Sequence, residues 1–165
     1  MSVIKSRRSA PKNEFLAVLE RTQLKVNKIV NKMNGKGYKL IGQYLADSAS
    51  KAHSFAIEAN YIFIGEDTSE EVFQSREQAF RSAIGELHVL YAQMNVLYFM
   101  HLDKRGFPDI RIAKKDTKAN KLVAEIIAEA TYAIEMIRKV LKSDKERWKR
   151  IIEKRNNNKL QEDKK

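Results

Sequence analysis

Basic side chains recur at helical spacing near the start of the chain. They advance by four, three and four residues, and this basic row consists of Arg21, Lys25, Lys28 and Lys32. On an α-helix the spacing aligns the side chains along one face, where like charges repel one another. A polyanion relieves that repulsion, so the chemistry that the row predicts is phosphate binding, as in nucleic-acid recognition.

Further basic residues extend this prediction along the chain. No acidic residue lies between Arg21 and Ala46, and this basic stretch also contains Lys36 and Lys39. A second set of expected nucleic-acid-binding residues, the C-terminal cluster, consists of Arg138, Lys142, Arg147 and Arg150. The competing interpretation is a solvated helix face whose basic residues pair with carboxylates of the last helix, at Glu125, Glu129 and Glu135.

The charge of the chain is segregated. Residues 1–39 carry ten basic and two acidic side chains, and residues 104–165 carry nineteen and ten. Residues 40–103 carry three basic and nine acidic side chains, so the net charge of +11 is concentrated at the two ends. We expect the ends to meet in one cationic surface after folding. Such a surface favours an anionic partner, most often nucleic acid.

One pair of residues has the spacing of a catalytic motif. Arg81 and His88 are seven residues apart, so two helical turns place both side chains on one face. The spacing resembles the Arg-x4–6-His signature of helical HEPN ribonucleases, in which the pair would act on a ribose 2′-hydroxyl and the scissile phosphate. Because the chain has eleven arginines and three histidines, chance alone readily supplies such a spacing.

Residue content argues against other catalytic and metal-binding classes. The chain has no cysteine, which excludes disulfides, thiol nucleophiles and cysteine-ligated zinc. A di-metal helical bundle requires a glutamate three residues before a histidine, and His53, His88 and His101 all lack one. We therefore expect no cofactor, no metal ion and no enzymatic activity.

Apolar residues repeat at steps of three and four in four segments, which predicts an all-α, up-down-up-down four-helix bundle. The helices are expected from Pro11 to Met33, from Tyr38 to Phe63, from Thr68 to a loop that begins at Asp103, and from Thr117 to Arg155. This plan divides the chain into a flexible basic terminus (1–10), the bundle (11–141), a basic helical extension (142–155) and a disordered tail (156–165).

Local signals mark several helix ends. Thr68 and Glu71 have the spacing of a capping box, in which they would satisfy free backbone N–H groups of the third helix. Gly65 offers a left-handed stop to the second helix, and Asp116 or Thr117 would cap the fourth. The expected buried positions of the third helix are Phe73, Arg76, Phe80, Ala83, Leu87, Leu90, Met94 and Leu97.

The fourth helix is expected to be longer than its neighbours. At about 1.5 Å per residue it spans roughly 58 Å, against roughly 39 Å for the second helix. Its last turns should therefore extend past the bundle and expose Trp148, Ile151 and Ile152. The alternative is a kink that folds these residues back onto the first helix.

The stretch from Val89 to Met100 has ten apolar residues among twelve, so it leaves no polar face. A helix that is apolar nearly all round is buried all round. We therefore expect a homo-oligomer whose interface includes Tyr91, Met94, Tyr98 and Phe99. The alternative is that the loop from Asp103 to Lys115 covers this surface.

Two observations bear on the cellular compartment. The N-terminal residues lack the apolar segment that follows the basic start of a secretory signal. The longest uncharged run, Leu87–Leu102, is too short and too polar to span a bilayer. We expect a cytoplasmic protein with no membrane contact.

A family resemblance lies between residues 38 and 61, in the segments Tyr38-Lys-Leu-Ile-Gly-Gln-Tyr-Leu-Ala-Asp and Ile57-Glu-Ala-Asn-Tyr61. They resemble the second helix of the Avd-like family, the accessory variability determinants of diversity-generating retroelements. That family is similar to the four-helix proteins encoded in intervening sequences of bacterial 23S ribosomal RNA genes. The resemblance covers roughly Lys25 to Leu141.

The resemblance implies a homopentamer of four-helix bundles that binds the element's reverse transcriptase and its structured RNA. Such an assembly supports the error-prone copying of a template repeat into cDNA. The resemblance also implies that basic surface residues act instead of a catalytic centre, and these map onto the basic row. Besides this function and the ribonuclease, the sequence leaves a third alternative, a helical scaffold that binds acidic protein partners.

Overall fold

A computed structural model of the protein describes residues 6–33, 38–102 and 117–162. These residues form four α-helices and no strand, which confirms the prediction of an all-α, four-helix fold. The helices are α1 (Ser6–Val30), α3 (Gln43–Tyr61), α4 (Glu70–Leu102) and α5 (Thr117–Glu162). A short π-helical segment, η1 (Tyr38–Gly42), leads into α3.

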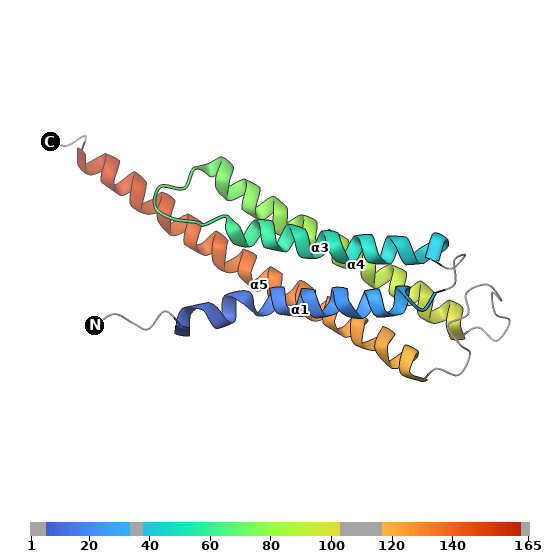
Figure 1. Ribbon diagram of the computed structural model, residues 1–165. Helices are drawn as coiled ribbons and strands as arrows, with labels where there is room; N and C mark the ends of the chain where they lie inside the picture. The colour runs from blue at the N-terminus through green and yellow to red at the C-terminus, as the bar shows by residue number, and fades with distance from the viewer. Residues whose placement is uncertain (1–5, 34–37, 103–116, 163–165) are drawn as a thin grey trace.

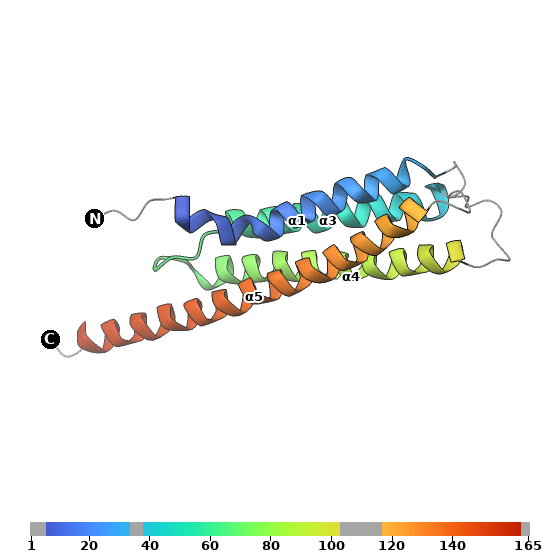
Figure 2. The ribbon, with the colours of Figure 1, turned by 90° about the horizontal axis from the view of Figure 1, so that it is seen from below.

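Consecutive helices run in opposite directions, so the chain passes up and down the bundle four times (Figure 1). Each helix packs against two others, because α1 and α4 both contact α3 and α5. Viewed from below, α1 and α3 form one layer and α4 and α5 form the other (Figure 2). This arrangement places the exposed faces of α4 and α5 next to each other.

The expected apolar positions meet in the centre of the bundle. All eight positions predicted to be buried on α4 are at most 9% exposed. The α3 residues that face them are small, and Ala52, Ala56 and Ala59 are fully buried. Small side chains allow two helices to approach closely, and the large rings of Phe15 and Phe80 fill the remaining space edge to face, with centroids 5.8 Å apart.

Two helices extend beyond the expected ends. Helix α1 begins at Ser6 instead of Pro11, and α5 continues to Glu162 instead of ending at Arg155. The expected flexible terminus and disordered tail are therefore helical at residues 6–10 and 156–162. Residues 156–162 contain no glycine or proline, so nothing interrupts backbone hydrogen bonding once the preceding helix has formed. In α1 the helix continues on the N-terminal side of Pro11 although proline has no N–H to donate to the Arg7 carbonyl oxygen.

Two of the predicted helix-end signals are wrong, and both lie in the connection between α3 and α4. Helix α3 ends at Tyr61 because Ile62 is extended (φ −78°, ψ 109°), and Gly65 does not adopt a left-handed conformation. The N-cap of α4 is Ser69, whose Oγ accepts a hydrogen bond of 3.4 Å from the Val72 N–H. Thr68 instead accepts a 2.7 Å hydrogen bond from the Gly65 N–H, so it closes the preceding turn. The other proposed cap, Asp116, lies outside the described residues.

The C-terminal part of α5 packs on this connection, which neither expectation for Trp148 foresaw. Trp148 stacks on Phe73 with ring centroids 4.8 Å apart and planes at 5°. Ile64, Phe73 and Ile151 form a small buried cluster with Trp148 against it. The apolar residues near the end of α5 are thus covered by the start of α4 and the segment before it, not by α1.

None of the described helices combines the length and the hydrophobicity that a membrane-spanning helix needs.

Candidate nucleic-acid interface

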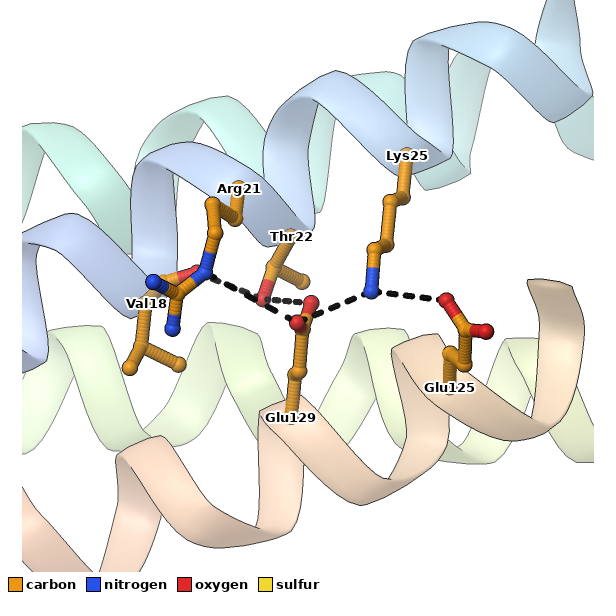
Figure 3. A network of polar contacts seen from close by, with 6 residues as sticks. All are labelled: Val18, Arg21, Thr22, Lys25, Glu125 and Glu129. Atoms are coloured by element: carbon orange, nitrogen blue, oxygen red, sulfur yellow. Dashed lines mark hydrogen bonds and ion pairs between the residues drawn. The ribbon is translucent and has the colours of Figure 1, made fainter.

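The first half of the basic row faces carboxylates of α5 (Figure 3). Lys25 Nζ lies 2.8 Å from Glu125 Oε2 and 2.9 Å from Glu129 Oε1. Arg21 Nε lies 3.9 Å from the same Glu129 oxygen. The buried Thr22 hydroxyl donates to the Val18 carbonyl oxygen at 2.9 Å, beside these ion pairs.

These contacts fix the charge state of the residues involved. The hydrogen bond to Glu125 and the neighbouring Glu129 carboxylate raise the pKa of Lys25 above its usual value, against the effect of burial. The hydrogen bond from Lys25 lowers the pKa of Glu125. Lys25 and Glu125 are therefore charged at neutral pH and neutralise one another. The prediction that every residue of the basic row binds a polyanion is wrong for Arg21 and Lys25. These two residues pair with carboxylates of α5, as the competing interpretation expected.

The other basic residues of this region differ from Arg21 and Lys25. Lys28 and Lys39 are exposed and have no carboxylate partner among the described residues. Lys32 is also exposed, and Lys36 lies outside the described part of the chain. Glu135, the third carboxylate expected to pair with the row, is exposed and forms no ion pair with a described residue.

Arg138 and Lys142 of the C-terminal cluster lie on another side of α5. Glu129 contacts Lys25 of α1, whereas Arg138 contacts His88 of α4. Nine residues separate Glu129 from Arg138, and at about 100° per residue they point to opposite sides of the helix. The basic row therefore does not meet Arg138 and Lys142 in one cationic surface, contrary to the expectation from sequence.

The residues of the C-terminal cluster lack carboxylate partners. Arg138 Nη2 lies 3.4 Å from His88 Nε2, and the Arg147 guanidinium lies 5.2 Å from the centroid of the Phe63 ring. Arg150 Nε donates to the Glu146 carbonyl oxygen at 3.2 Å. Lys142 and the adjacent Lys139 are exposed and have no partner among the described residues.

An open groove of 610 Å³ runs between α4 and α5. Its lining consists of Glu77, Arg81, Ile84, Gly85, Arg138, Leu141, Lys142, Lys145 and Glu146. Glu77 Oε1 accepts hydrogen bonds from Arg81 at 2.6 and 2.9 Å and lies 3.0 Å from Lys145 Nζ. These cations, Arg81 foremost, lower the pKa of Glu77. The other two cations that line the groove, Arg138 and Lys142, have no carboxylate partner among the described residues.

Of the candidate catalytic pair, Arg81 lines the same groove, and His88 contacts the groove residue Arg138. Arg81 is held by Glu77, and His88 contacts Arg138 one helix away. A guanidinium group only donates, so in a hydrogen bond between these two groups the acceptor is His88 Nε2. The sequence did not indicate the contact between Arg138 and His88, because fifty residues separate them along the chain.

Only part of the expected oligomer interface is exposed. Met94 is fully buried in the core, because it occupies the inward positions of α4 together with Leu90 and Leu97. Tyr91 is 40% exposed and Tyr98 is half-buried, while the side chain of Phe99 lies outside the described part. Besides Tyr91, the exposed apolar residues in this part of α4 form the α4 stripe, which consists of Val89, Ala92 and Val96.

The described side chains can therefore bind anions through arginine and lysine, but they include no group of three metal-ligating residues. The cations that remain available lie on α5 and at the end of α1. Comparison with known protein families, curated proteins and solved structures found no match for this chain.

Proposed function

We propose that the protein is a non-enzymatic, RNA-binding accessory protein of a diversity-generating retroelement. In this role it binds the element's reverse transcriptase and template RNA and supports mutagenic synthesis of cDNA in the cytoplasm. The resemblance of residues 38–61 to the Avd-like family suggests the element, and the charge of the surface supports the choice of RNA.

One observation carries the RNA-binding part of the proposal. Cations without a carboxylate partner recur along one stretch of α5, at Arg138, Lys139, Lys142, Arg147 and Arg150. From the first to the last, this stretch is about 18 Å long at the rise of an α-helix. Unpaired cations bind phosphates with release of counterions, which supplies affinity that depends on salt more than on sequence.

A salt series with a labelled single-stranded RNA tests this proposal. We expect log K to fall linearly with log salt, and Lys142→Gln to make the slope shallower by about 0.7, the contribution of one single-strand phosphate contact. The matched control is Lys51→Gln, because Lys51 is an exposed helical lysine paired with Asp47 on α3. A flat salt response, or equal effects of the two substitutions, contradicts the proposal.

The proposed protein acts as a homo-oligomer, which the resemblance implies to be a pentamer. The α4 stripe supports this, because Val89 and Val96 are 44% and 51% exposed on a helix that is otherwise well packed. Binding of the reverse transcriptase is tested by co-purification with and without ribonuclease treatment. Loss of the enzyme after treatment would mean that RNA alone joins the two proteins.

A second candidate function is the HEPN-like ribonuclease. The observation that favours it is the contact between His88 and Arg138, which places an imidazole beside a guanidinium that lines the groove and has no carboxylate partner among the described residues. The observation against it is that Glu77 already neutralises Arg81. We therefore retain the non-enzymatic proposal and test the ribonuclease by substitution of His88.

A further inference from the structure

Two aromatic side chains at the end of α3 are unusually exposed. Tyr61, the last residue of α3, is 83% exposed, and Phe63 is 71% exposed. Among the large apolar residues that the structure describes as exposed, these two have the highest values. Burial of an aromatic ring is favourable, and these two rings remain in contact with water. They are therefore candidates for contact with a binding partner.

The Phe63 ring is held in place although it is exposed. The guanidinium carbon of Arg147 lies 5.2 Å from the ring centroid, within the range of a cation–π interaction. On another side, a Cβ atom added at Gly65 would lie 3.0 Å from Phe63 Cε1, so the ring packs close against the glycine backbone. The ring is therefore positioned before any partner arrives, which lowers the entropic cost of binding.

The cation beside Phe63 rests on a well-packed support. Arg147 precedes Trp148, which stacks on Phe73 at 4.8 Å. Further along α5, Lys154 pairs with Glu66 at 2.6 Å, and Arg155 donates to the Thr68 carbonyl oxygen at 2.8 Å. These contacts fasten α5 to the segment that carries Phe63. The carboxylate of Glu66 is thereby neutralised near the ring.

A polar side chain near Phe63 can contact the edge of a base. Asn60, Phe63 and Arg147 line a cavity of 60 Å³. This volume is too small to hold a nucleobase, so a base would lie on the outer surface of the ring. The Asn60 amide has both donors and an acceptor for the edge of such a base.

Proteins commonly use this combination of groups to bind single-stranded nucleic acid. Unpaired bases stack on exposed aromatic rings and on arginine planes, while neighbouring cations contact the phosphates. Resting on the RNA-binding function proposed above, we propose that Tyr61, Phe63 and Arg147 form a stacking site for unpaired bases of RNA. Arg150 lies three residues after Arg147 and therefore on the same side of α5, where it can contact the phosphates of the strand.

Fluorescence anisotropy with a labelled single-stranded oligoadenylate tests the site. We expect Phe63→Ala to weaken binding roughly 5- to 150-fold, the range that loss of one base–aromatic stack produces. Tyr61→Ala should act in the same direction. Tyr44→Ala is the matched control, since Tyr44 is a 60% exposed aromatic residue near the start of α3, and its substitution should leave affinity unchanged. The wild type should also bind the unpaired strand more tightly than a duplex of the same length.

Phe63→Leu separates stacking from a general apolar contact. Leucine keeps most of the apolar bulk but lacks the aromatic face, so we expect RNA binding to fall as in Phe63→Ala. Retention of full affinity by Phe63→Leu would assign the residue to a different partner, such as an apolar segment of a protein. Circular dichroism checks that each variant keeps its helix content, which the exposure of Phe63 leads us to expect.

The outcomes distinguish this site from the proposed function. If the wild type binds no RNA, the proposed function and the site both fail. If the wild type binds RNA and Phe63→Ala binds as tightly as Tyr44→Ala, the site alone is refuted. Trp148, the single tryptophan of the chain, lies next to Arg147 and supplies a fluorescence change as an independent readout of binding.

Discussion

The Nε atom of Arg76 lies 2.7 Å from Oδ2 of Asp144, and this ion pair joins α4 to the C-terminal half of α5. Arg76 is only 9% exposed and also donates to the carbonyl oxygens of Ala59 and Ile62 at the end of α3. One arginine thus connects three helices. The spacing of α4 predicted that Arg76 would be buried, and the structure supplies the partners that a buried charge requires.

Removal of the carboxylate should therefore destabilise the fold. Asp144→Ala leaves the Arg76 guanidinium buried without its counter-ion, and we expect a loss of about 3 kcal/mol in the free energy of unfolding. Urea denaturation measures it. The control is Asp47→Ala, because Asp47 pairs with Lys51 on the exposed surface of α3, and it should cause no resolvable change. Similar losses for both variants would show that the Arg76 pair has no special role.

A glycine within α4 offers a stabilising substitution. A Cβ atom added at Gly85 would meet nothing within 4 Å, and glycine is unfavourable inside a helix. Gly85→Ala should raise the free energy of unfolding by roughly 0.5–1 kcal/mol. The measurement is the same denaturation experiment, and a less stable variant would mean that this backbone is not helical in solution.

The α4 stripe should determine the oligomeric state. Val89→Glu places a charge on a surface that is apolar and exposed, so it should dissociate an oligomer without unfolding the subunit. Light scattering combined with size-exclusion chromatography gives the mass. Val72→Glu is the matched control, because Val72 is 42% exposed on the same helix but lies outside the stripe. Two variants with the same mass as the wild type would exclude the stripe as the interface.

Stability should decrease in acid because carboxylates are ion-paired in the folded state. Hydrogen bonds from Lys25 lower the pKa of Glu125, and those from Arg81 and Lys145 lower the pKa of Glu77. A lowered folded-state pKa contributes stability that is complete above the usual value of 4.5 and is lost as the pH falls through the lowered value. Thermal unfolding followed at decreasing pH measures the loss, and Glu77→Gln should show a weaker dependence than the wild type.

The raised pKa of Lys25 has the opposite sign. Its contribution is complete below the usual lysine value of 10.5 and should be lost only as the pH rises through the raised value. The contact between α1 and α5 is thus weakened at both extremes of pH. A loss of stability between neutral pH and the usual pKa of lysine would have to come from the titration of another group.

The ribonuclease alternative predicts a single decisive result. Labelled RNA incubated with the wild type should remain intact if the protein is not an enzyme. Cleavage by the wild type that disappears in His88→Ala would reverse this conclusion, because His88 would then be the required acid or base. Unchanged cleavage in His88→Ala would instead indicate a contaminating nuclease.

The helices and most of the core follow from the sequence alone. Steps of three and four residues place Phe80, Leu87 and Leu97 on one face of α4 whatever that helix packs against, because the backbone geometry fixes the spacing. Helix ends were less accurate, since α1 and α5 contain no residue that stops them where the apolar pattern ends. Met94 was expected both among the inward positions of α4 and in the oligomer interface, and its complete burial contradicts the second expectation.

Contacts between distant residues were decided only by the tertiary structure. Lys25 and Glu129 are 104 residues apart, and the sequence allowed either that ion pair or a free lysine. The burial of Trp148, the approach of Arg138 to His88 and the position of Arg147 over Phe63 likewise depend on how each helix is rotated about its axis. Periodicity fixes which residues of a helix share a face, but only packing against the other helices determines which neighbour each face meets.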